Sequence, residues 1–202
     1  MKNRLTIVST CLNESSSIQA HVKHLKDLAH FLSVNYIVVD GGSLDGTHEI
    51  LTKSLLHSKY CQLHHSSIYR AWNHGIRAVA EQSQYISFLG VGDYYDIDRL
   101  SKALVAIDSS LPDIAYGDAI FSSTKKSKGL PVERMATWHW GRLPFCHSGT
   151  LFSASLFHNN LFNEEYKIAG DLDWLLRLHN AERKNTALNY MYLEDIRVYL
   201  KP

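Results

Sequence analysis

Short apolar runs alternate with helically spaced apolar positions along the first half of the chain. The runs are rich in β-branched and aromatic residues, as in strands buried within a parallel sheet. The segments between them carry apolar side chains every three or four positions, which predicts amphipathic helices. Strands are expected at residues 5–9, 36–39, 61–63 and 85–89, and helices at 18–32, 47–56 and 69–80.

The second half of the chain gives a less regular pattern. A helix is expected at 98–107, strand pieces at 114–118 and 119–121, and another helix at 170–180. Residues 122–129 are polar and lysine-rich, which is typical of a loop or hairpin tip. Strand–helix alternation with short connections predicts an α/β fold: a mostly parallel central sheet, helices on both faces, and right-handed crossovers. We expect residues 1–202 to form a single domain.

Composition and charge exclude several classes of protein. The 202 residues are 45% hydrophobic, which is enough for one domain with a sizeable core. The 21 basic and 20 acidic side chains give a net charge of +1, so no whole-molecule attraction to nucleic acid is expected. Three widely spaced cysteines form no disulfide framework and favour the cytoplasm. No apolar stretch approaches the roughly 20 residues that span a bilayer.

Acidic residues follow the predicted strands at the points where ligands bind in parallel sheets. Asp40 comes directly after one strand, and Asp93 follows a Gly-Val-Gly turn after another. A carboxylate beside glycines can approach a nucleotide or a divalent metal closely. The alternative is that Asp40-Gly-Gly-Ser and Asp45-Gly-Thr are only turns with capping residues. The residues alone leave both interpretations open.

Five motifs in a fixed order carry a resemblance to a known family. They are NE at 13–14, VVDGGSLDGT at 38–47, NHGI at 73–76, FLGVGD at 88–93 and AGDLDWLLRL at 169–178. Together they resemble the family 2 inverting glycosyltransferases with the GT-A (Rossmann-like) fold, in particular bacterial enzymes of exopolysaccharide, capsule and O-antigen synthesis. The likeness covers roughly residues 4–180. It implies transfer of a sugar from a nucleotide-diphosphate donor to an acceptor hydroxyl with inversion of configuration.

The resemblance assigns the donor to residues 1–95 and the acceptor and catalytic base to residues 96–202. Asp40 would contact the base or ribose, and Arg70 would pair with a donor phosphate. The implied nucleotide- and substrate-binding set is Thr10, Asn13, Glu14, Asp40, Ser43, Asp45, Tyr69, Arg70, Asn73 and Asp173.

The resemblance also implies a catalytic base and a metal. Asp171 would deprotonate the acceptor hydroxyl, with Asp173 as the alternative base. Asp93, with His147 as a further ligand, would hold Mn²⁺ or Mg²⁺ against the donor diphosphate. Four positions depart from the common pattern. Gly41, Gly92 and Gly170 stand where many relatives carry acids, and relatives often carry an aspartate where Arg70 stands.

Two other functions compete with the transferase. A sugar nucleotidyltransferase also uses acids and a metal on an α/β sheet, but it is expected to have a glycine-rich loop with a basic residue after the first strand. The second is a non-catalytic module that binds nucleotide sugars, suggested by Gly92 and Gly170.

The resemblance extends to the partners. The acceptor would be a saccharide or a lipid-linked saccharide, which implies peripheral association with the inner face of the membrane. Trp138 and Trp140 could stack on the acceptor sugar or pack in the core. The oligomeric state is not predicted. The few residues after the last motif lead us to expect no membrane anchor and no second domain.

Overall fold

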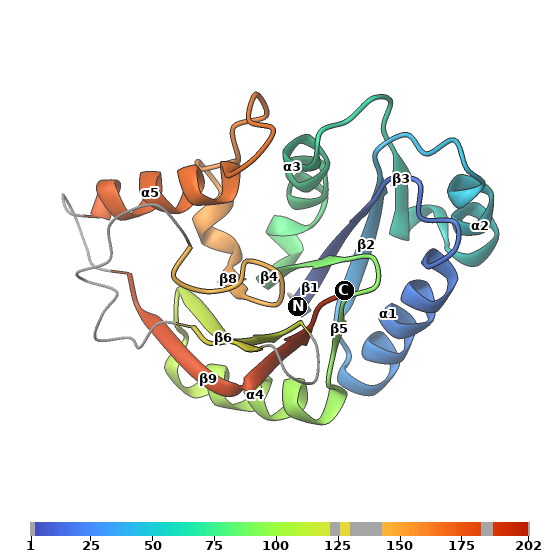
Figure 1. The fold of residues 1–202 in the computed structure, drawn as a ribbon. Helices are drawn as coiled ribbons and strands as arrows, with labels where there is room; N and C mark the ends of the chain where they lie inside the picture. The colour runs from blue at the N-terminus through green and yellow to red at the C-terminus, as the bar shows by residue number, and fades with distance from the viewer. Residues whose placement is uncertain (1–2, 122–125, 130–142, 183–187, 202) are drawn as a thin grey trace.

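A twisted β-sheet runs through the molecule with helices on both of its faces (Figure 1). This computed structural model describes residues 3–121, 126–129, 143–182 and 188–201. The strands are β1 (Asn3–Cys11), β2 (Asn35–Asp40), β3 (Tyr60–Gln62), β4 (Ser83–Gly90), β5 (Tyr94–Tyr95), β6 (Ile114–Ile120), β7 (Lys126–Ser127), β8 (Leu151–Ser153) and β9 (Tyr190–Tyr199).

The α-helices are α1 (Ile18–Leu32), α2 (Thr47–Ser54), α3 (Ile68–Val79), α4 (Ile97–Ser110) and α5 (Gly170–Glu182). None of the helices in the described part of the chain is both long and apolar enough to cross a membrane.

The strand order brings the carboxyl ends of β1, β2 and β4 to the same edge of the sheet. In the described residues the order is β3-β2-β1-β4-β8-β6-β9-β5, with β7 beside β6. β1 is parallel to both β2 and β4, and β2 is parallel to β3. β8 is antiparallel to its neighbours β4 and β6, whereas β6 and β9 are parallel. The loops after β1, β2 and β4 therefore emerge side by side, where α/β proteins bind ligands.

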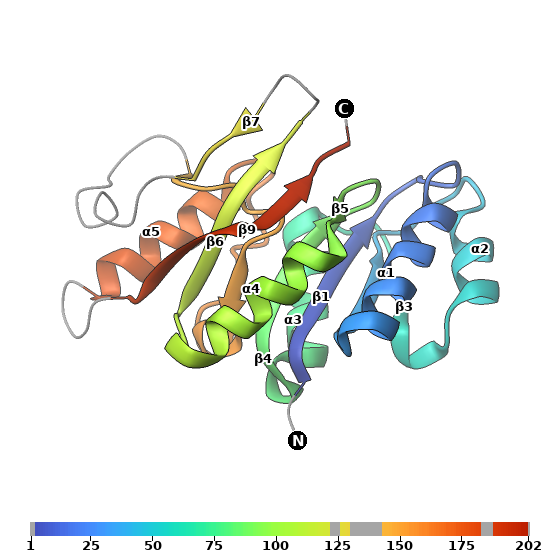
Figure 2. The same ribbon diagram turned by 90° about the horizontal axis from the view of Figure 1, so that it is seen from below.

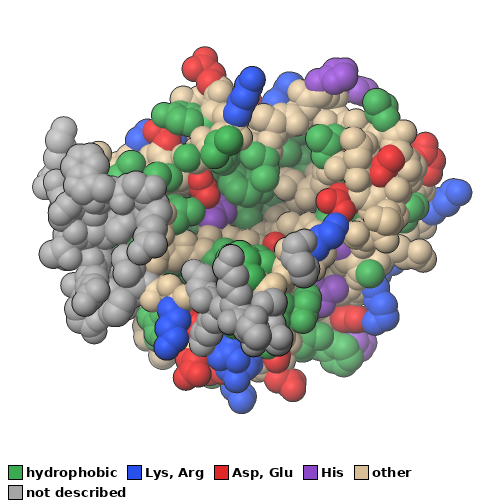
Figure 3. Space-filling model, viewed as in Figure 1, with side chains coloured by type: hydrophobic (Ala, Val, Ile, Leu, Met, Phe, Trp, Pro, Cys, Tyr) green, Lys and Arg blue, Asp and Glu red, His purple; other side chains and the backbone are tan. Residues whose placement is uncertain are grey.

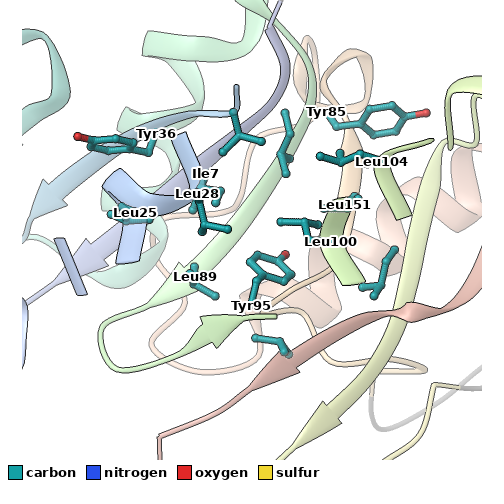
Figure 4. Close-up of a cluster of buried hydrophobic side chains, with 14 of the residues drawn as sticks. Ile7, Leu25, Leu28, Tyr36, Tyr85, Leu89, Tyr95, Leu100, Leu104 and Leu151 are labelled. Carbon is teal, nitrogen blue, oxygen red and sulfur yellow. The ribbon is translucent and has the colours of Figure 1, made fainter. Parts of the chain in front are cut away.

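One face of the sheet is covered by α1 and α4. Leu25 and Leu28 of α1 and Leu100 and Leu104 of α4 are at most 1% exposed and belong to one core cluster with Ile7 of β1 (Figure 4). Their three- and four-residue spacing puts each pair on one side of its helix, as the sequence pattern predicts.

The other face of the sheet is covered by α3 and α5. Ile76 of α3 and Trp174 of α5 pack in a second cluster with Val8 and Phe88 of the sheet. The Trp174 ring is 1% exposed and stacks on Phe157 at a centroid distance of 4.8 Å, while its Nε1–H donates to the Asn160 carbonyl at 2.6 Å. This cluster fixes the start of α5 against α3.

The expected α/β fold with helices on both faces is confirmed, and α1 has the bounds that the sequence predicts. The pieces expected at 114–118 and 119–121 form the single strand β6, and β7 pairs with it as a hairpin would. β8 and β9 were not predicted. In β9 only Ile196 and Val198 are buried, so the strand lacks the apolar run that identifies β1 and β2.

Gly117 allows β9 to approach β6, and its substitution provides a test of this pairing. A Cβ at this position would lie 1.9 Å from the Ile196 carbonyl oxygen and 2.6 Å from that of Leu193. We expect Gly117→Ala to lower the free energy of unfolding by about 3 kcal/mol, measured by urea denaturation.

Gly46→Ala is the matched control for this substitution. Gly46 has φ +97° but open space around its missing Cβ, so only backbone strain of about 1–2 kcal/mol is expected. An equal decrease in the free energy of unfolding of Gly117→Ala and Gly46→Ala would contradict the close β6–β9 contact.

Candidate functional site

A cavity of about 360 Å³ opens at the carboxyl ends of β1 and β4. Its volume falls in the roughly 300–1,000 Å³ range of small-ligand sites. Figure 3 shows this face of the molecule hollowed, with hydrophobic side chains inside and charged and histidine side chains around them. The lining residues are Thr10, Cys11, Leu12, Glu14, Gly41, Ser66, Ser67, Ile68, Ala71, Gly90 and Val91. Thr10 and Glu14 therefore lie in the wall of this cavity, and their contact with a donor stays a prediction.

Asp40 lies beneath the cavity rather than in its wall. Its side chain is 0% exposed. Oδ1 accepts from the Gly42 and Ser43 backbone amides at 3.1 and 2.9 Å and from the Ser43 hydroxyl at 2.6 Å. Oδ2 accepts from the Tyr60 hydroxyl and the Gln62 amide, both at 3.3 Å. Asp40 thus holds the loop that carries Gly41, and a direct contact with a nucleoside would require this network to open.

Asn13, Ser43 and Asp45 join the loop after β1 to the loop after β2. The Asn13 amide N–H donates to Ser43 Oγ at 2.8 Å, and Asn13 Oδ1 accepts from the Leu44 amide at 2.9 Å. Asp45 accepts from the Ser15 amide at 2.9 Å and from the Thr47 hydroxyl at 2.6 Å. The Thr47 hydroxyl is the largest cause of a lowered Asp45 pKa. These residues frame the cavity, and their predicted contact with the nucleotide stays a prediction.

Asp171 lies in the first turn of α5, against Tyr69 of α3. The Gly170 amide donates to the Tyr69 hydroxyl at 2.8 Å, and the Asp171 charge adds to burial in raising the Tyr69 pKa. A Cβ at Gly170 would lie 2.8 Å from the Tyr69 ring, which accounts for the glycine at this position. The preceding Ala169 has φ +60°, a strained backbone conformation directly before the first residue of α5.

The negative charge of Asp171 influences the pKa of His147. The His147 ring is 7% exposed and stacks on Trp72 and Phe88 at centroid distances of 4.6 and 4.9 Å. Burial lowers the His147 pKa to about 4, and the Asp171 charge opposes this shift. Nε2 is buried without a hydrogen-bond partner among the described residues. His147 is therefore a neutral imidazole at pH 7.

Asp173 has a different environment from Asp171. Its Oδ2 accepts from Arg177 Nε at 2.9 Å in an ion pair one helical turn along α5. Arg177 also donates to the Leu161 carbonyl at 2.8 Å. This ion pair ties Asp173 into the packing of α5.

Asn73 and Arg70, both on α3, are placed differently from each other. Asn73 is 1% exposed, and its amide group makes hydrogen bonds of 2.8–2.9 Å to both backbone groups of Phe162 and to Glu164. It therefore tethers α3 to the chain before α5, and we leave it out of the proposed donor contacts. Ser67 caps α3, because its Oγ accepts from the Arg70 amide at 3.3 Å, and the Arg70 side chain is exposed.

Asp93 is engaged by two parts of the chain at once. Its Oδ2 accepts from the Ser148 hydroxyl at 3.0 Å, and its Oδ1 accepts from the Lys201 amide at 2.9 Å. Burial raises the Asp93 pKa, and these hydrogen bonds oppose the rise.

The described residues supply one carboxylate, Asp93, at this position. Each of its oxygens accepts one hydrogen bond, and no group of three His, Cys, Asp or Glu side chains in the described ranges converges on a metal position. The metal-ligand roles expected of Asp93 and His147 gain no support from this donor set.

Sequence reasoning missed three residues that the structure brings to the site: Trp72, Ser148 and Lys201. Trp72 belongs to the apolar face of a predicted helix, so only its neighbour His147 could have drawn attention to it. Lys201 follows a strand that was not predicted, and no sequence signal marks it. Trp138 and Trp140 lie outside the described residues.

The chain belongs to glycosyl transferase family 2. The model of that family matches residues 6–172, which include the cavity lining, Asp93 and Asp171. A search of curated protein sequences found no match.

Solved structures of the GT-A fold are similar to this chain. S. aureus TarS residues 1–349 in complex with UDP-GlcNAc is 18% identical, with a TM-score of 0.70 over 98% of this chain and 58% of that one. Mannosyltransferase PcManGT from Pyrobaculum calidifontis, in complex with GDP-Man and Mn²⁺, is 13% identical, with a TM-score of 0.62 over 99% of this chain and 57% of that one. This chain therefore spans under two thirds of these relatives, and the likeness establishes the fold.

The Tyr69 hydroxyl supports the residue before Asp171, and removing it gives a stability test. Tyr69→Phe leaves the Gly170 amide without its acceptor. We expect the free energy of unfolding to fall by about 1–3 kcal/mol, measured by urea denaturation. Tyr166→Phe is the control, because the long 3.4 Å contact between its hydroxyl and Asp173 is exposed. An unchanged stability of Tyr69→Phe would contradict this support of α5.

Two buried histidines predict a loss of stability in mild acid. Burial lowers the pKa of both His21 and His147 to about 4. The unfolded chain binds their protons near pH 6.5, whereas the folded chain binds them only near pH 4. The free energy of unfolding should therefore fall as the pH drops between these values, by about 1.4 kcal/mol per pH unit for each histidine.

Urea denaturation at pH 7 and pH 5 checks this slope. His147→Phe keeps a ring beside Trp72 and Phe88. It removes one of the two titrating groups, so the free energy of unfolding should fall less steeply with pH, by about 1.4 kcal/mol per pH unit. A slope that is the same in wild type and His147→Phe would contradict a neutral buried imidazole.

Proposed function

We propose that this protein is an inverting glycosyltransferase that moves a sugar from a nucleoside-diphosphate donor to an acceptor hydroxyl. The observation that carries the proposal is that α3 joins two features. Ser67, at its start, and Ala71 line the cavity at the strand ends, and Tyr69 between them supports the start of α5 beside Asp171. A donor in the cavity would thus present its sugar toward a carboxylate held in place by the same helix.

In the proposed reaction Asp171 accepts the proton of the acceptor hydroxyl. The acceptor oxygen forms a bond to the anomeric carbon while the bond from that carbon to the diphosphate oxygen breaks, which inverts the configuration. The proton stays on Asp171, and the electron pair leaves with the nucleoside diphosphate. Asp173 is less suited to this role because it is ion-paired with Arg177 at 2.9 Å.

The frame around the cavity contributes positioning. Asp40 holds the loop that carries Gly41, and the Asn13–Ser43 hydrogen bond joins that loop to the one after β1. Such cross-links keep the donor-binding backbone in one conformation before the donor arrives. We assign no step to a divalent cation, since no group of three ligating side chains converges among the described residues.

The wider role rests on the resemblance alone. A lipid-linked or free saccharide acceptor, a place in bacterial surface polysaccharide synthesis, and a cytoplasmic location at the inner membrane face agree with the family. The division into a donor half at 1–95 and an acceptor half at 96–202 also stays a prediction.

A thermal-shift screen tests the proposal. Purified protein is heated with UDP, GDP, dTDP, CDP and ADP and with the corresponding nucleotide sugars, with EDTA and with Mn²⁺. A ligand that binds only the folded state raises the melting temperature. We expect one nucleoside family to do so, and that nucleotide sugar to release its nucleoside diphosphate slowly in the presence of a saccharide acceptor. No shift with any of them would overturn the proposal.

The two rival functions have less support. The nucleotidyltransferase predicts a glycine-rich basic loop after β1, whereas residues 12–17 contain no glycine, lysine or arginine. The binding module was suggested by Gly92 and Gly170, and each has a packing reason. Gly170 lies against the Tyr69 ring and Gly92 against the Lys201 side chain. Packing therefore accounts for both glycines, and neither is evidence that a catalytic activity has been lost.

A further inference from the structure

Lys201 bridges the loops that follow β1 and β4. Its amide donates to Asp93 Oδ1 at 2.9 Å, and its ammonium donates to Glu14 Oε2 at 3.1 Å and to Ser17 Oγ at 3.2 Å. Glu14 and Gly90 line the donor cavity, and Gly90 lies next to the Asp93 carboxylate. The lysine is therefore one contact away from the proposed donor site.

The position of Lys201 is fixed by the strands before it. Tyr94 and Tyr95 pair with Tyr199 and Val198, and the Tyr94 and Tyr199 rings stack at 4.7 Å. The Leu200 amide continues the ladder by donating to the Ile120 carbonyl at 2.8 Å. Figure 2 shows this end of the chain at the same edge of the sheet as the loops after β1 and β4, opposite the N-terminus.

Lys201 occupies the space that a side chain at position 92 would need. A Cβ on Gly92 would lie 2.6 Å from Lys201 Cδ and 3.1 Å from its Cβ and Cγ. Gly92 also has φ +95°, which a residue with a side chain rarely adopts. An aspartate at this position, before Asp93, is therefore incompatible with the observed lysine. The aliphatic part of Lys201 therefore fills the space that a second carboxylate ligand would need, and its ammonium lies beyond it, at Glu14 and Ser17.

The charges around the lysine suit an anionic ligand. An ammonium has three N–H donors, and two of them are directed to Glu14 and Ser17. The Lys201 side chain is 45% exposed, so the third donor can be reached by a ligand. A nucleotide sugar brings a negatively charged diphosphate next to Glu14 and Asp93, and a positive group is needed there to offset the repulsion.

We propose that Lys201 binds the donor diphosphate and stabilises the departing nucleoside diphosphate, so that sugar transfer proceeds without a divalent cation. This inference rests on the proposed function. The ammonium keeps its proton throughout and supplies a charge-assisted hydrogen bond to a phosphate oxygen. Glu14 and Ser17 hold it in position, while the Lys201 amide keeps Asp93 in the same cluster.

Calorimetric titration of the full chain tests the inference. The probe is whichever of UDP, GDP, dTDP, CDP and ADP binds wild type, titrated in EDTA and again in Mn²⁺, alongside the corresponding nucleoside. We expect the wild-type affinity to be the same in both buffers. Lys201→Met should weaken the nucleoside diphosphate about tenfold or more in EDTA and leave the nucleoside unaffected. Lys201→Arg should keep most of the affinity.

Lys102→Met is the matched control, because it removes an equal charge from an exposed position on α4. If wild type binds the nucleoside diphosphate only with Mn²⁺, or if Lys201→Met binds it as tightly as wild type in EDTA, the inference is overturned and the proposed function stands. If wild type binds no nucleoside diphosphate in either buffer, the proposed function and the inference both fall.

Discussion

Asp171→Asn is expected to slow sugar transfer by about a thousandfold while leaving donor affinity within about twofold of wild type. The substitution keeps the size of the side chain and the hydrogen bond to the Leu172 amide at 2.9 Å, but it removes the proton acceptor. The rate is measured as release of the nucleoside diphosphate from the donor in the presence of acceptor, and the affinity by calorimetry. A structural disturbance would change both quantities, so the separation of rate from affinity identifies the base.

Asp173→Asn is the matched control on the same turn of α5. It weakens the ion pair with Arg177, which is partly exposed and worth about 0.3–0.5 kcal/mol, and the rate should stay within about tenfold of wild type. If Asp173→Asn abolishes transfer while Asp171→Asn does not, the assignment of the base is reversed. Full activity in both variants would exclude a carboxylate base on α5.

Asp40→Ala is expected to reduce stability and donor affinity together. The free energy of unfolding should fall by about 3 kcal/mol, because five donors from four residues lose a buried acceptor. Nucleoside diphosphate affinity should fall at least about tenfold as the loop carrying Gly41 loosens. Urea denaturation and calorimetry measure the two effects.

A decrease in both the free energy of unfolding and the nucleoside diphosphate affinity would show that Asp40 supports the loop rather than contacting the ligand. If Asp40 touched the nucleoside without holding the loop, Asp40→Ala would lose affinity at nearly unchanged stability. Asp27→Ala is the control, since Asp27 is a half-buried residue of α1 whose partner Lys23 is exposed, and its loss should change stability by less than about 0.5 kcal/mol.

The parallel half of the fold was predictable because its signals are local. The apolar run of β2 and the helical spacing of Leu25 and Leu28 each specify an element without reference to the rest of the chain. The strand-end motifs then located Thr10 and Glu14 at the cavity. The element expected at 18–32 matches α1 at both ends.

The other half depends on contacts that no local pattern encodes. β9 is recognisable only beside β6, because its side chains are mostly half-exposed and do not alternate clearly. Lys201 reaches Asp93 from 108 positions away along the chain. The burial of Asp40 depends likewise on Tyr60 and Gln62 of β3. Sequence motifs identified acidic residues at the site, but they could not separate those that hold loops from those that face the ligand.

A crystal structure of the protein with its nucleoside diphosphate, grown in EDTA, tests the central claim most directly. The account predicts density for the nucleotide in the cavity lined by Thr10, Gly41 and Gly90, with the diphosphate within hydrogen-bond distance of Lys201 Nζ. A nucleotide bound elsewhere on the molecule would contradict the account.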